Sequence, residues 1–252
     1  MSQVPILETR SLGRKFGSLE AVSDLSFSVS SGEILGVIGP NGAGKSTFIN
    51  LVTGHIKPTS GKVFINGKDL TGTSPWTVAR AGVSRTFQIV KPFNGMTVRE
   101  NIAIGILYES NGTNRLSVAL KEAESILHEV GLAGAGDKLP GELSTADVRR
   151  LEFAKALASR PQLLLLDEVM AGLRPTEIGP SLELIRKLRE SGTTVIVVEH
   201  VMKAILAVSD RVLVLAQGKL LTQGLPHEVL TDPRVIEVYL GHRFAMRKKG
   251  GN

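Results

Sequence analysis

The chain has 252 residues, of which 42% are hydrophobic and 21% charged, as expected of one sizeable globular unit with a full core. It contains no cysteine, which excludes disulfides, thiolate metal sites and thiol catalysis. Aromatic residues make up only 4%, which argues against a surface that stacks single-stranded nucleic acid, so we expect no nucleic-acid partner despite the net charge of +6.

The apolar runs of the chain have the length of strands. None approaches the ~20 residues that a helix needs to span a bilayer. The first residues include neither a basic leader nor an apolar signal core. A cytoplasmic protein is the simplest expectation.

The N-terminal region shows strand patterns. Residues 25–29 alternate apolar and polar side chains, as in a half-buried antiparallel strand. Residues 62–65 precede Asn66-Gly67, a dipeptide typical of the tight turn of a β-hairpin. We therefore predict antiparallel strands in this part of the chain.

Residues 39–47 fit the pattern G-x-x-x-x-G-K-[ST] without exception. They follow an apolar run at 34–38 and precede a helix-compatible stretch at 48–52, the context that a phosphate-binding loop requires. Glycines let successive backbone N–H groups converge on an anion, and the dipole of the following helix favours the same phosphates. We expect Lys45 to reach the β- and γ-phosphates and Ser46 to bind Mg²⁺. The alternative, a glycine-rich turn with a chance lysine, does not explain these flanks.

The rest of the chain predicts an α/β fold with a helical insertion. Strand patterns largely disappear between residues 92 and 157, where 115–130 has apolar residues at helical spacing and 131–141 is a glycine-rich connection. Aliphatic runs at 163–166, 195–198 and 212–215 are typical of buried strands in a parallel sheet. Helical patterns at 147–159 and 176–191 precede the first and the second of these runs.

Two of these aliphatic strands end in side chains suited to phosphate chemistry. Ligands of open α/β sheets bind at the carboxyl ends of strands, so Asp167 and Glu168 are expected to face the phosphate loop. Asp167 is then placed to hold Mg²⁺, and Glu168 to polarise the attacking water; the alternative is an acidic cap before a turn. His200 follows the strand at 194–198 and can donate to a γ-phosphate oxygen. A histidine there, taken alone, is more often structural, but beside the other two motifs we favour contact with the phosphate.

Together these residues resemble the ATP-binding subunit of an ATP-binding-cassette (ABC) transporter, over nearly the whole chain. Residues 39–47 match the Walker A loop, 163–168 the Walker B strand, Gln88 the Q-loop and His200 the switch histidine. Further segments are similar to the branched-chain amino acid importers: residues 36–51, Arg85-Thr86-Phe87-Gln88, Ala171-Gly172-Leu173, Glu199-His200 and Val238-Tyr239-Leu240-Gly241.

The resemblance implies a P-loop NTPase core with a mixed, mainly parallel sheet, an N-terminal antiparallel β subdomain and an inserted α-helical subdomain. Residues 1–90 and 158–240 are expected to form the core, 91–157 the insertion and 241–252 a basic tail. ATP and Mg²⁺ are the implied cofactors, with Ser46, Gln88 and Asp167 on the metal and Glu168, His200 and Gln88 in hydrolysis. The implied nucleotide contacts, beginning with an aromatic side chain on adenine, are Phe16, Val22, Gly39, Pro40, Asn41, Gly42, Ala43, Gly44, Lys45, Ser46 and Thr47.

The signature segment departs from the family pattern. Members usually carry a sequence close to Leu-Ser-Gly-Gly-Gln, which contacts ATP on the partner subunit, whereas this chain has Leu143-Ser144-Thr145-Ala146-Asp147. Ser144 and Asp147 suit a helix cap, but Cβ atoms at positions 145 and 146 would crowd the partner's ATP, and Asp147 brings a negative charge towards it. Val169 and Arg174 are also unusual, since proline and an acid or asparagine are common at these positions.

These departures bear on the partners that the resemblance implies. Membrane-spanning permease subunits are expected to bind at the groove near Gln88. A solute-binding protein is expected to act on this chain indirectly, through the permease. The chain itself is expected to be peripheral, on the cytoplasmic face of the membrane. A heterodimer with a second, regular ATPase subunit explains the altered signature best, and a homodimer that tolerates it is the alternative.

The expected function is ATP hydrolysis that energises import of branched-chain amino acids or related small polar solutes such as amides or urea. Alternatives are an ATPase for export of lipid or lipopolysaccharide, a soluble ABC ATPase, and a nucleotide-dependent regulator with weak turnover.

Overall fold

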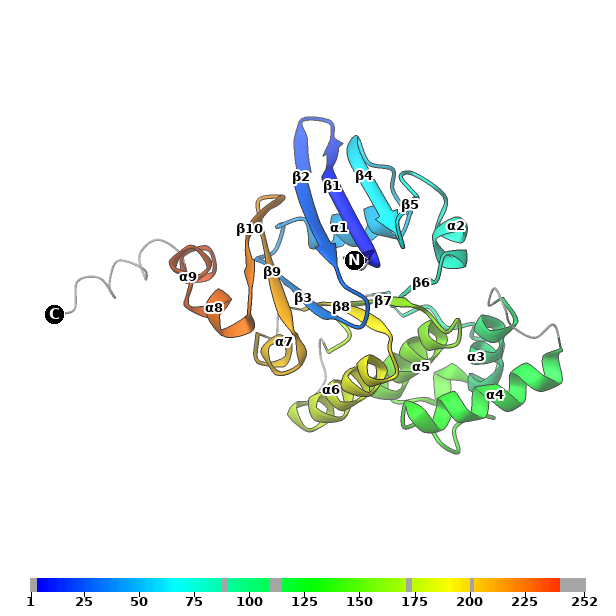
Figure 1. Cartoon of the computed structure of the whole chain (residues 1–252). Helices are drawn as coiled ribbons and strands as arrows, with labels where there is room; N and C mark the ends of the chain where they lie inside the picture. Colours follow the sequence, from blue (N-terminus) through cyan, green and yellow to red (C-terminus); the bar gives the residue numbers. More distant parts are fainter. Residues whose placement is uncertain (1–3, 88–89, 109–114, 171–173, 200–201, 241–252) are drawn as a thin grey trace.

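The computed structural model describes residues 4–87, 90–108, 115–170, 174–199 and 202–240, which contain a four-stranded and a six-stranded sheet (Figure 1). The four-stranded sheet is antiparallel, with the order β2-β1-β4-β5. Its strands are β1 (Leu7–Phe16), β2 (Leu19–Val29), β4 (Ser60–Ile65) and β5 (Lys68–Asp69). The turn between β4 and β5 has positive φ at Asn66 (50°) and Gly67 (74°), as a tight hairpin turn requires, so the predicted hairpin is confirmed.

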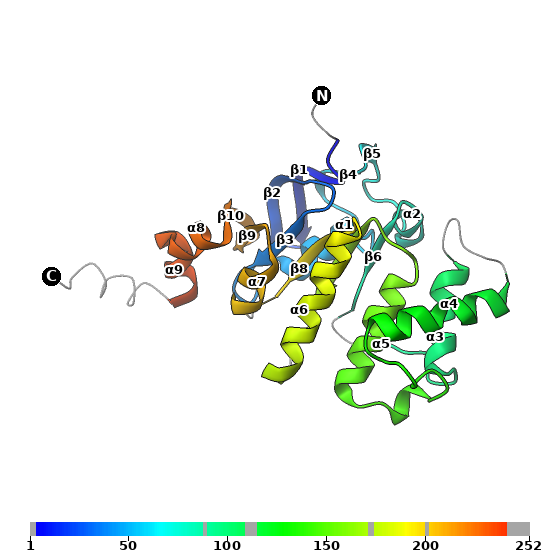
Figure 2. The ribbon, with the colours of Figure 1, turned by 60° about the horizontal axis from the view of Figure 1, so that its bottom comes forward.

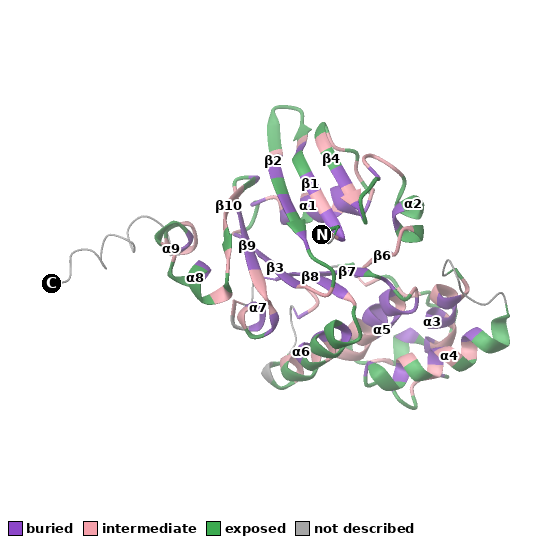
Figure 3. Cartoon of the chain, in the orientation of Figure 1, coloured by how far each residue is buried: buried purple, intermediate pink, exposed green. Residues whose placement is uncertain are grey.

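The six-stranded sheet has the order β10-β9-β3-β8-β7-β6, and all neighbours are parallel except β10 and β9. Its strands are β3 (Ile34–Ile38), β6 (Val83–Arg85), β7 (Leu163–Asp167), β8 (Thr194–Val198), β9 (Arg211–Ala216) and β10 (Lys219–Gly224). Every residue of β3, β7 and β8 is buried, because both faces of the sheet are covered (Figure 3). The aliphatic runs at 163–166, 195–198 and 212–215 predicted buried parallel strands, and this is confirmed for β7, β8 and residues 212–215 of β9.

Successive residues of these strands enter different cores. On β7, Leu164 and Leu166 pack with the helices, whereas Leu163 and Leu165 pack towards α1 (Lys45–Val52) and the antiparallel sheet. The core on the side of Leu163 and Leu165 therefore holds α1, the helix that follows the phosphate loop, against the antiparallel sheet.

The remaining helices lie mainly on the other face of the six-stranded sheet or beside it (Figure 2). Within the described parts of residues 92–157 there are helices but no strand, as predicted. The helices, including one short 3₁₀ turn η1, are α2 (Pro75–Arg80), α3 (Val98–Leu107), α4 (Leu116–Glu129), η1 (Pro140–Glu142), α5 (Thr145–Leu157), α6 (Pro175–Glu190), α7 (Met202–Val208), α8 (Pro226–Thr231) and α9 (Pro233–Leu240). Among the described residues no helix has both the length and the apolar character to cross a bilayer.

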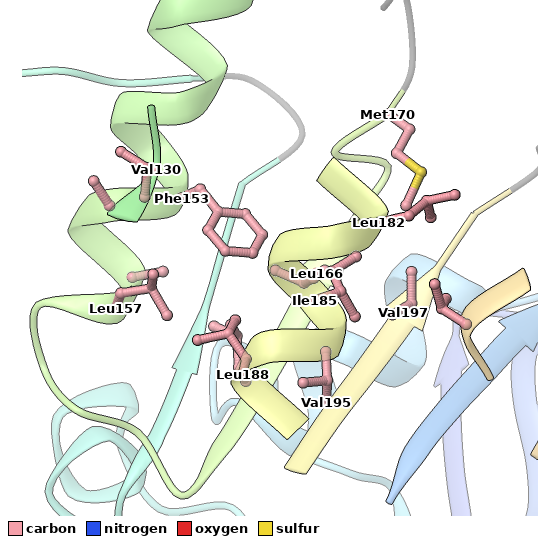
Figure 4. Packing of buried hydrophobic residues seen from close by; sticks show 14 of the residues in the cluster. Val130, Phe153, Leu157, Leu166, Met170, Leu182, Ile185, Leu188, Val195 and Val197 are labelled. Carbon is pink, nitrogen blue, oxygen red and sulfur yellow. The ribbon is translucent and has the colours of Figure 1, made fainter. Parts of the chain in front are cut away.

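Apolar packing joins the α3–α5 group to the main sheet. Figure 4 shows the ring of Phe153 on α5 pointing towards α6, and Leu166 of β7 and Ile185 of α6 belong to the same cluster. These side chains belong to one buried cluster that continues through α3 and α4. The signature helix α5 is therefore packed against the elements that flank the Walker B strand.

Candidate nucleotide site

The parallel register brings the two phosphate motifs to one edge of the six-stranded sheet. Val198 of β8 pairs with Val37 on one side and with Asp167 on the other, so these residues form one row across three strands. The chain leaves this row into the glycine loop after β3 and into Glu168 after β7. The expected convergence on the carboxyl edge is confirmed.

The glycine loop adopts a backbone that a side chain would disturb. Gly44 caps α1 with φ of 100°, and a Cβ atom at this position would lie 2.5 Å from the carbonyl oxygen of Ala21. The hairpin turn between β9 and β10 supports the loop from the other side, because the N–H of Gly218 donates to the carbonyl of Ala43 at 3.1 Å. Glycine at position 44 is thus required by both conformation and space.

Lys45 is buried at the centre of this loop. Its Nζ donates to the carbonyl oxygens of Gly39 at 2.7 Å and Pro40 at 3.1 Å. Burial lowers the pKa of Lys45, while the carboxylates of Glu168 and Asp167 oppose that shift. The ammonium group therefore lies within electrostatic reach of both acids.

An open cavity of about 650 Å³ lies over the loop. Residues 41–47 line it together with Phe16, Glu168 and Gln217. The side chain of Phe16 is 44% exposed, and the guanidinium of Arg14 lies 4.6 Å from its ring centre. Three expected contacts are not part of the cavity wall. Val22 is buried beneath Gly44, and the carbonyls of Gly39 and Pro40 accept from Nζ of Lys45.

Asp167 is held by an arginine that the sequence analysis did not single out. Nη2 of Arg85 lies 3.3 Å from Oδ2 of Asp167, and both side chains are almost buried. The backbone N–H of Asp167 donates to the hydroxyl of Thr86 at 3.0 Å. Burial raises the pKa of Asp167, Arg85 and Lys45 oppose this shift, and Glu168 adds to it.

The side-chain oxygens at this edge suit a magnesium ion whose other ligands are phosphate oxygens of the nucleotide and water. Ser46 is exposed in the first turn of α1, and Asp167 supplies a carboxylate on the neighbouring motif. Hydroxyl and carboxylate oxygens suit Mg²⁺, which usually keeps one or two protein ligands together with substrate phosphates and water. The described residues contain no cluster of three acidic or histidine side chains placed to hold a metal ion.

Glu168 follows β7 with φ of 52°, in the left-handed region. Its N–H donates to the carbonyl of Val198 at 2.9 Å, and its own carbonyl accepts from Nη1 of Arg149 at 3.3 Å. The position of Glu168 is therefore tied both to β8 and to the signature helix α5.

Glu199 lies at the end of β8 and is fully buried. Its Oε1 accepts from the N–H of Met170 at 2.7 Å, which links the segment after Glu168 to the end of β8. The expected functional residues Gln88 and His200, and the importer-like segments at 171–173 and 241, lie outside the described residues.

The signature segment begins helix α5 as predicted. Ser144 is the N-cap, and its hydroxyl accepts from the N–H of Asp147 at 3.2 Å. The same hydroxyl donates to Oδ2 of Asp147 at 2.8 Å, while Oδ1 accepts from Nη1 of Arg150 at 3.1 Å. The negative charge of Asp147 is thus compensated within its own helix.

Sequence reasoning identified the motif residues but not their supports. Arg85 and Arg149 each contact a motif residue, and the Gln217-Gly218 turn bonds to the glycine loop and lines the cavity. Glu199 acts one step further away, because it accepts from the N–H of Met170, two positions after Glu168. The available signals were weak: Arg85 stands three positions before Gln88 in an importer-like segment, and Gln217-Gly218 separates two apolar strands.

Comparisons with known proteins agree with this geometry. A family model described as ABC transporter matches residues 22–171, and one described as branched-chain amino acid ATP-binding cassette transporter matches residues 219–245. The chain is 39% identical to LivG of Salmonella typhimurium, a high-affinity branched-chain amino acid transport ATP-binding protein, over 96% of this chain and 99% of that protein. It is 38% identical to BraF of Pseudomonas aeruginosa, similarly described, over 94% and 98% of the two chains.

Solved structures show the same likeness. A nucleotide-free ATP-binding cassette from an ABC transporter superposes with a TM-score of 0.85 and 31% identity, covering 94% of this chain and all of that one. A cassette in its ADP conformation gives a TM-score of 0.84 at 31% identity, covering 94% and 99%. The chain therefore belongs to the ABC transporter family of nucleotide-binding ATPases.

Proposed function

We propose that this chain hydrolyses ATP to energise import of branched-chain amino acids or similar small polar solutes. The observation that carries the ATPase proposal is the row formed by Val37, Val198 and Asp167, which puts the glycine loop and the acidic pair at one sheet edge. The solute class is supported by the match at residues 219–245 and by the names of the LivG and BraF relatives.

In this proposal each site residue has a separate role at the nucleotide, including Gln88 and His200, which lie outside the described residues. Phe16 stacks on adenine, and the backbone of residues 41–47 with Lys45 holds the phosphates. Ser46 and Asp167, with Gln88, hold Mg²⁺, which would neutralise charge on the β- and γ-phosphates. Glu168 orients the attacking water, and His200 donates to the γ-phosphate.

Glu168→Gln tests the hydrolytic role. The variant keeps the shape of the side chain but removes its negative charge, so we expect ATP to remain bound while phosphate release falls by about two orders of magnitude or more. Glu183→Gln, on an exposed side chain of α6, is the matched control and should leave turnover unchanged. Turnover by Glu168→Gln equal to that of the parent would exclude this role.

The partners in the proposal are membrane-spanning permease subunits and a second ATPase subunit, with the solute-binding protein acting through the permease. We place the chain on the cytoplasmic face of the membrane. Thr145 and Ala146 replace the signature glycines at the start of α5, which favours a heterodimer with a regular partner. Brisk, cooperative hydrolysis by the purified chain alone would contradict the heterodimer and leave the homodimer.

The transport role has its own test. Detergent co-purification from the native membrane should recover apolar permease subunits together with this chain. Loss of the chain should abolish energised uptake of labelled leucine or of a related solute. Recovery without any membrane protein would instead favour a soluble ABC ATPase or a nucleotide-dependent regulator.

A further inference from the structure

Arg85 connects elements that are far apart in the sequence. It ends β6, and its guanidinium contacts side chains of other elements: Nη2 lies 3.3 Å from Oδ2 of Asp167, and Nη1 donates to Oδ1 of Asn50 at 2.7 Å. Nη1 also lies 3.4 Å from the hydroxyl of Thr53 at the end of α1. The Arg85 side chain is 10% exposed, so these contacts are made away from bulk water.

Each contacted element carries one proposed metal ligand. Asn50 is on α1, whose first turn contains Ser46, and Asp167 ends β7. Arg85 itself stands three positions before Gln88 in the chain. One guanidinium therefore joins the helix and the strand that carry Ser46 and Asp167, two of the proposed oxygen ligands.

We propose that Arg85 is a positioning residue for the magnesium–nucleotide site, which fixes α1 and β7 relative to one another. This inference rests on the proposed function, since it assigns Arg85 a role towards the metal of that same site. With Oδ2 of Asp167 bound to Arg85, the rotation of the carboxylate is restricted, and its other oxygen is left for the metal or a metal-bound water.

The chemistry of arginine suits this role better than that of lysine. A planar guanidinium presents several N–H donors in fixed directions, so it bonds a carboxylate and an amide oxygen at the same time. Nε of Arg85 also donates to the carbonyl of Thr86 at 3.3 Å, and its guanidinium lies 4.6 Å from the centre of the Phe87 ring. A lysine ammonium would keep the charge but would not keep this set of contacts.

The experiment compares ATP binding with and without metal. Calorimetry on the full-length purified chain measures the dissociation constant of ATP in excess EDTA and in excess Mg²⁺. For Arg85→Gln we expect the value in EDTA to stay within about twofold of the parent, because the loop at 41–47 makes the phosphate contacts. The Mg²⁺ factor is the dissociation constant of ATP in EDTA divided by that in Mg²⁺. In Arg85→Gln this factor should be smaller than in the parent by about tenfold or more. If the parent's own factor is below about tenfold, the factor of the variant should fall to about one.

Two further variants complete the design. Arg85→Lys keeps the buried charge, so its Mg²⁺ factor should lie between those of the parent and of Arg85→Gln. If Arg85→Gln does not fold, Arg85→Lys serves as the test variant. Arg10→Gln removes an exposed arginine of β1, which pairs with Glu8, and should behave like the parent.

The possible results are distinguishable. An unchanged Mg²⁺ factor in Arg85→Gln overturns the proposal. Equal weakening in EDTA and in Mg²⁺ overturns it as well, since Arg85 would then support the phosphate loop and not the metal. Failure of the proposed function gives a different result, because the parent itself would then bind no ATP.

Discussion

The Arg85–Asp167 pair predicts a large and pH-dependent loss of stability when its cation is removed. In the nucleotide-free protein, Arg85→Leu leaves a carboxylate that is 5% exposed without its nearest cation, 3.3 Å away. At this separation an effective dielectric constant near 20 gives an attraction of about 4–5 kcal/mol. Lys45 still attracts Asp167 in the variant, so we expect the free energy of unfolding to fall by about 2–4 kcal/mol.

The sign of the pH dependence follows from the pKa of Asp167. Burial raises this pKa above 3.8, Arg85 opposes the rise, and its removal therefore raises the pKa further. An acid whose folded-state pKa is raised loses stability as pH increases, because the unfolded chain ionises more readily. The deficit of Arg85→Leu relative to the parent should grow once the pH passes the parent's folded-state pKa. The deficit should become constant once the pH exceeds the folded-state pKa of Asp167 in the variant.

Urea unfolding followed by circular dichroism at about pH 5 and about pH 8 measures this difference. The loss at the higher pH should exceed the loss at the lower one, and Arg85→Leu combined with Asp167→Leu should recover part of it, since no buried charge is then left alone. A deficit below about 1 kcal/mol at the higher pH, or one that does not change with pH, would refute the reasoning.

Three further predictions concern the same region. Phe48→Ala empties a site that is 1% exposed and packed 5.5 Å from the ring of Phe27, so it should cost about 3–5 kcal/mol in urea unfolding. Phe16→Ala removes a 44% exposed ring, so it should leave stability within about 0.5 kcal/mol and weaken ATP binding about two- to tenfold in calorimetry. Asp147→Gln should change phosphate release by the lone chain less than about threefold, because Arg150 already compensates the charge; a tenfold rise would contradict this.

Features encoded by neighbouring residues were predictable from the sequence. The Asn66-Gly67 turn, the buried strands β7 and β8 and the glycine loop each depend on a few consecutive side chains whose conformational preferences are strong. The helix boundaries were less certain: the expected helices at 147–159 and 176–191 are Thr145–Leu157 and Pro175–Glu190. The N-cap geometry of Ser144 explains the earlier start of the first one.

The supports of the site were not predictable, because they join residues that are distant in the chain. Arg85 and Asp167 are separated by 82 positions, and Met170 and Glu199 by 29. No local pattern pairs such residues. Their contacts exist only because β6, β7 and β8 are adjacent and parallel, and strand order is a property of the whole sheet.

The signature segment shows how a correct local prediction leads to an incomplete electrostatic argument. From the sequence, Asp147 adds a negative charge beside the partner's phosphates. In the fold its carboxylate is bonded by the hydroxyl of Ser144 and by Arg150, so the net charge presented there is smaller than the residue type indicates. What remains unusual is the shape of the segment and the use of the Ser144 hydroxyl, which donates to Asp147 within its own helix. In a dimer, this signature segment would contact the ATP bound by the partner subunit. The argument that this contact is weak therefore depends on the Cβ atoms at 145 and 146 and on the bonded Ser144 hydroxyl, and not on charge repulsion.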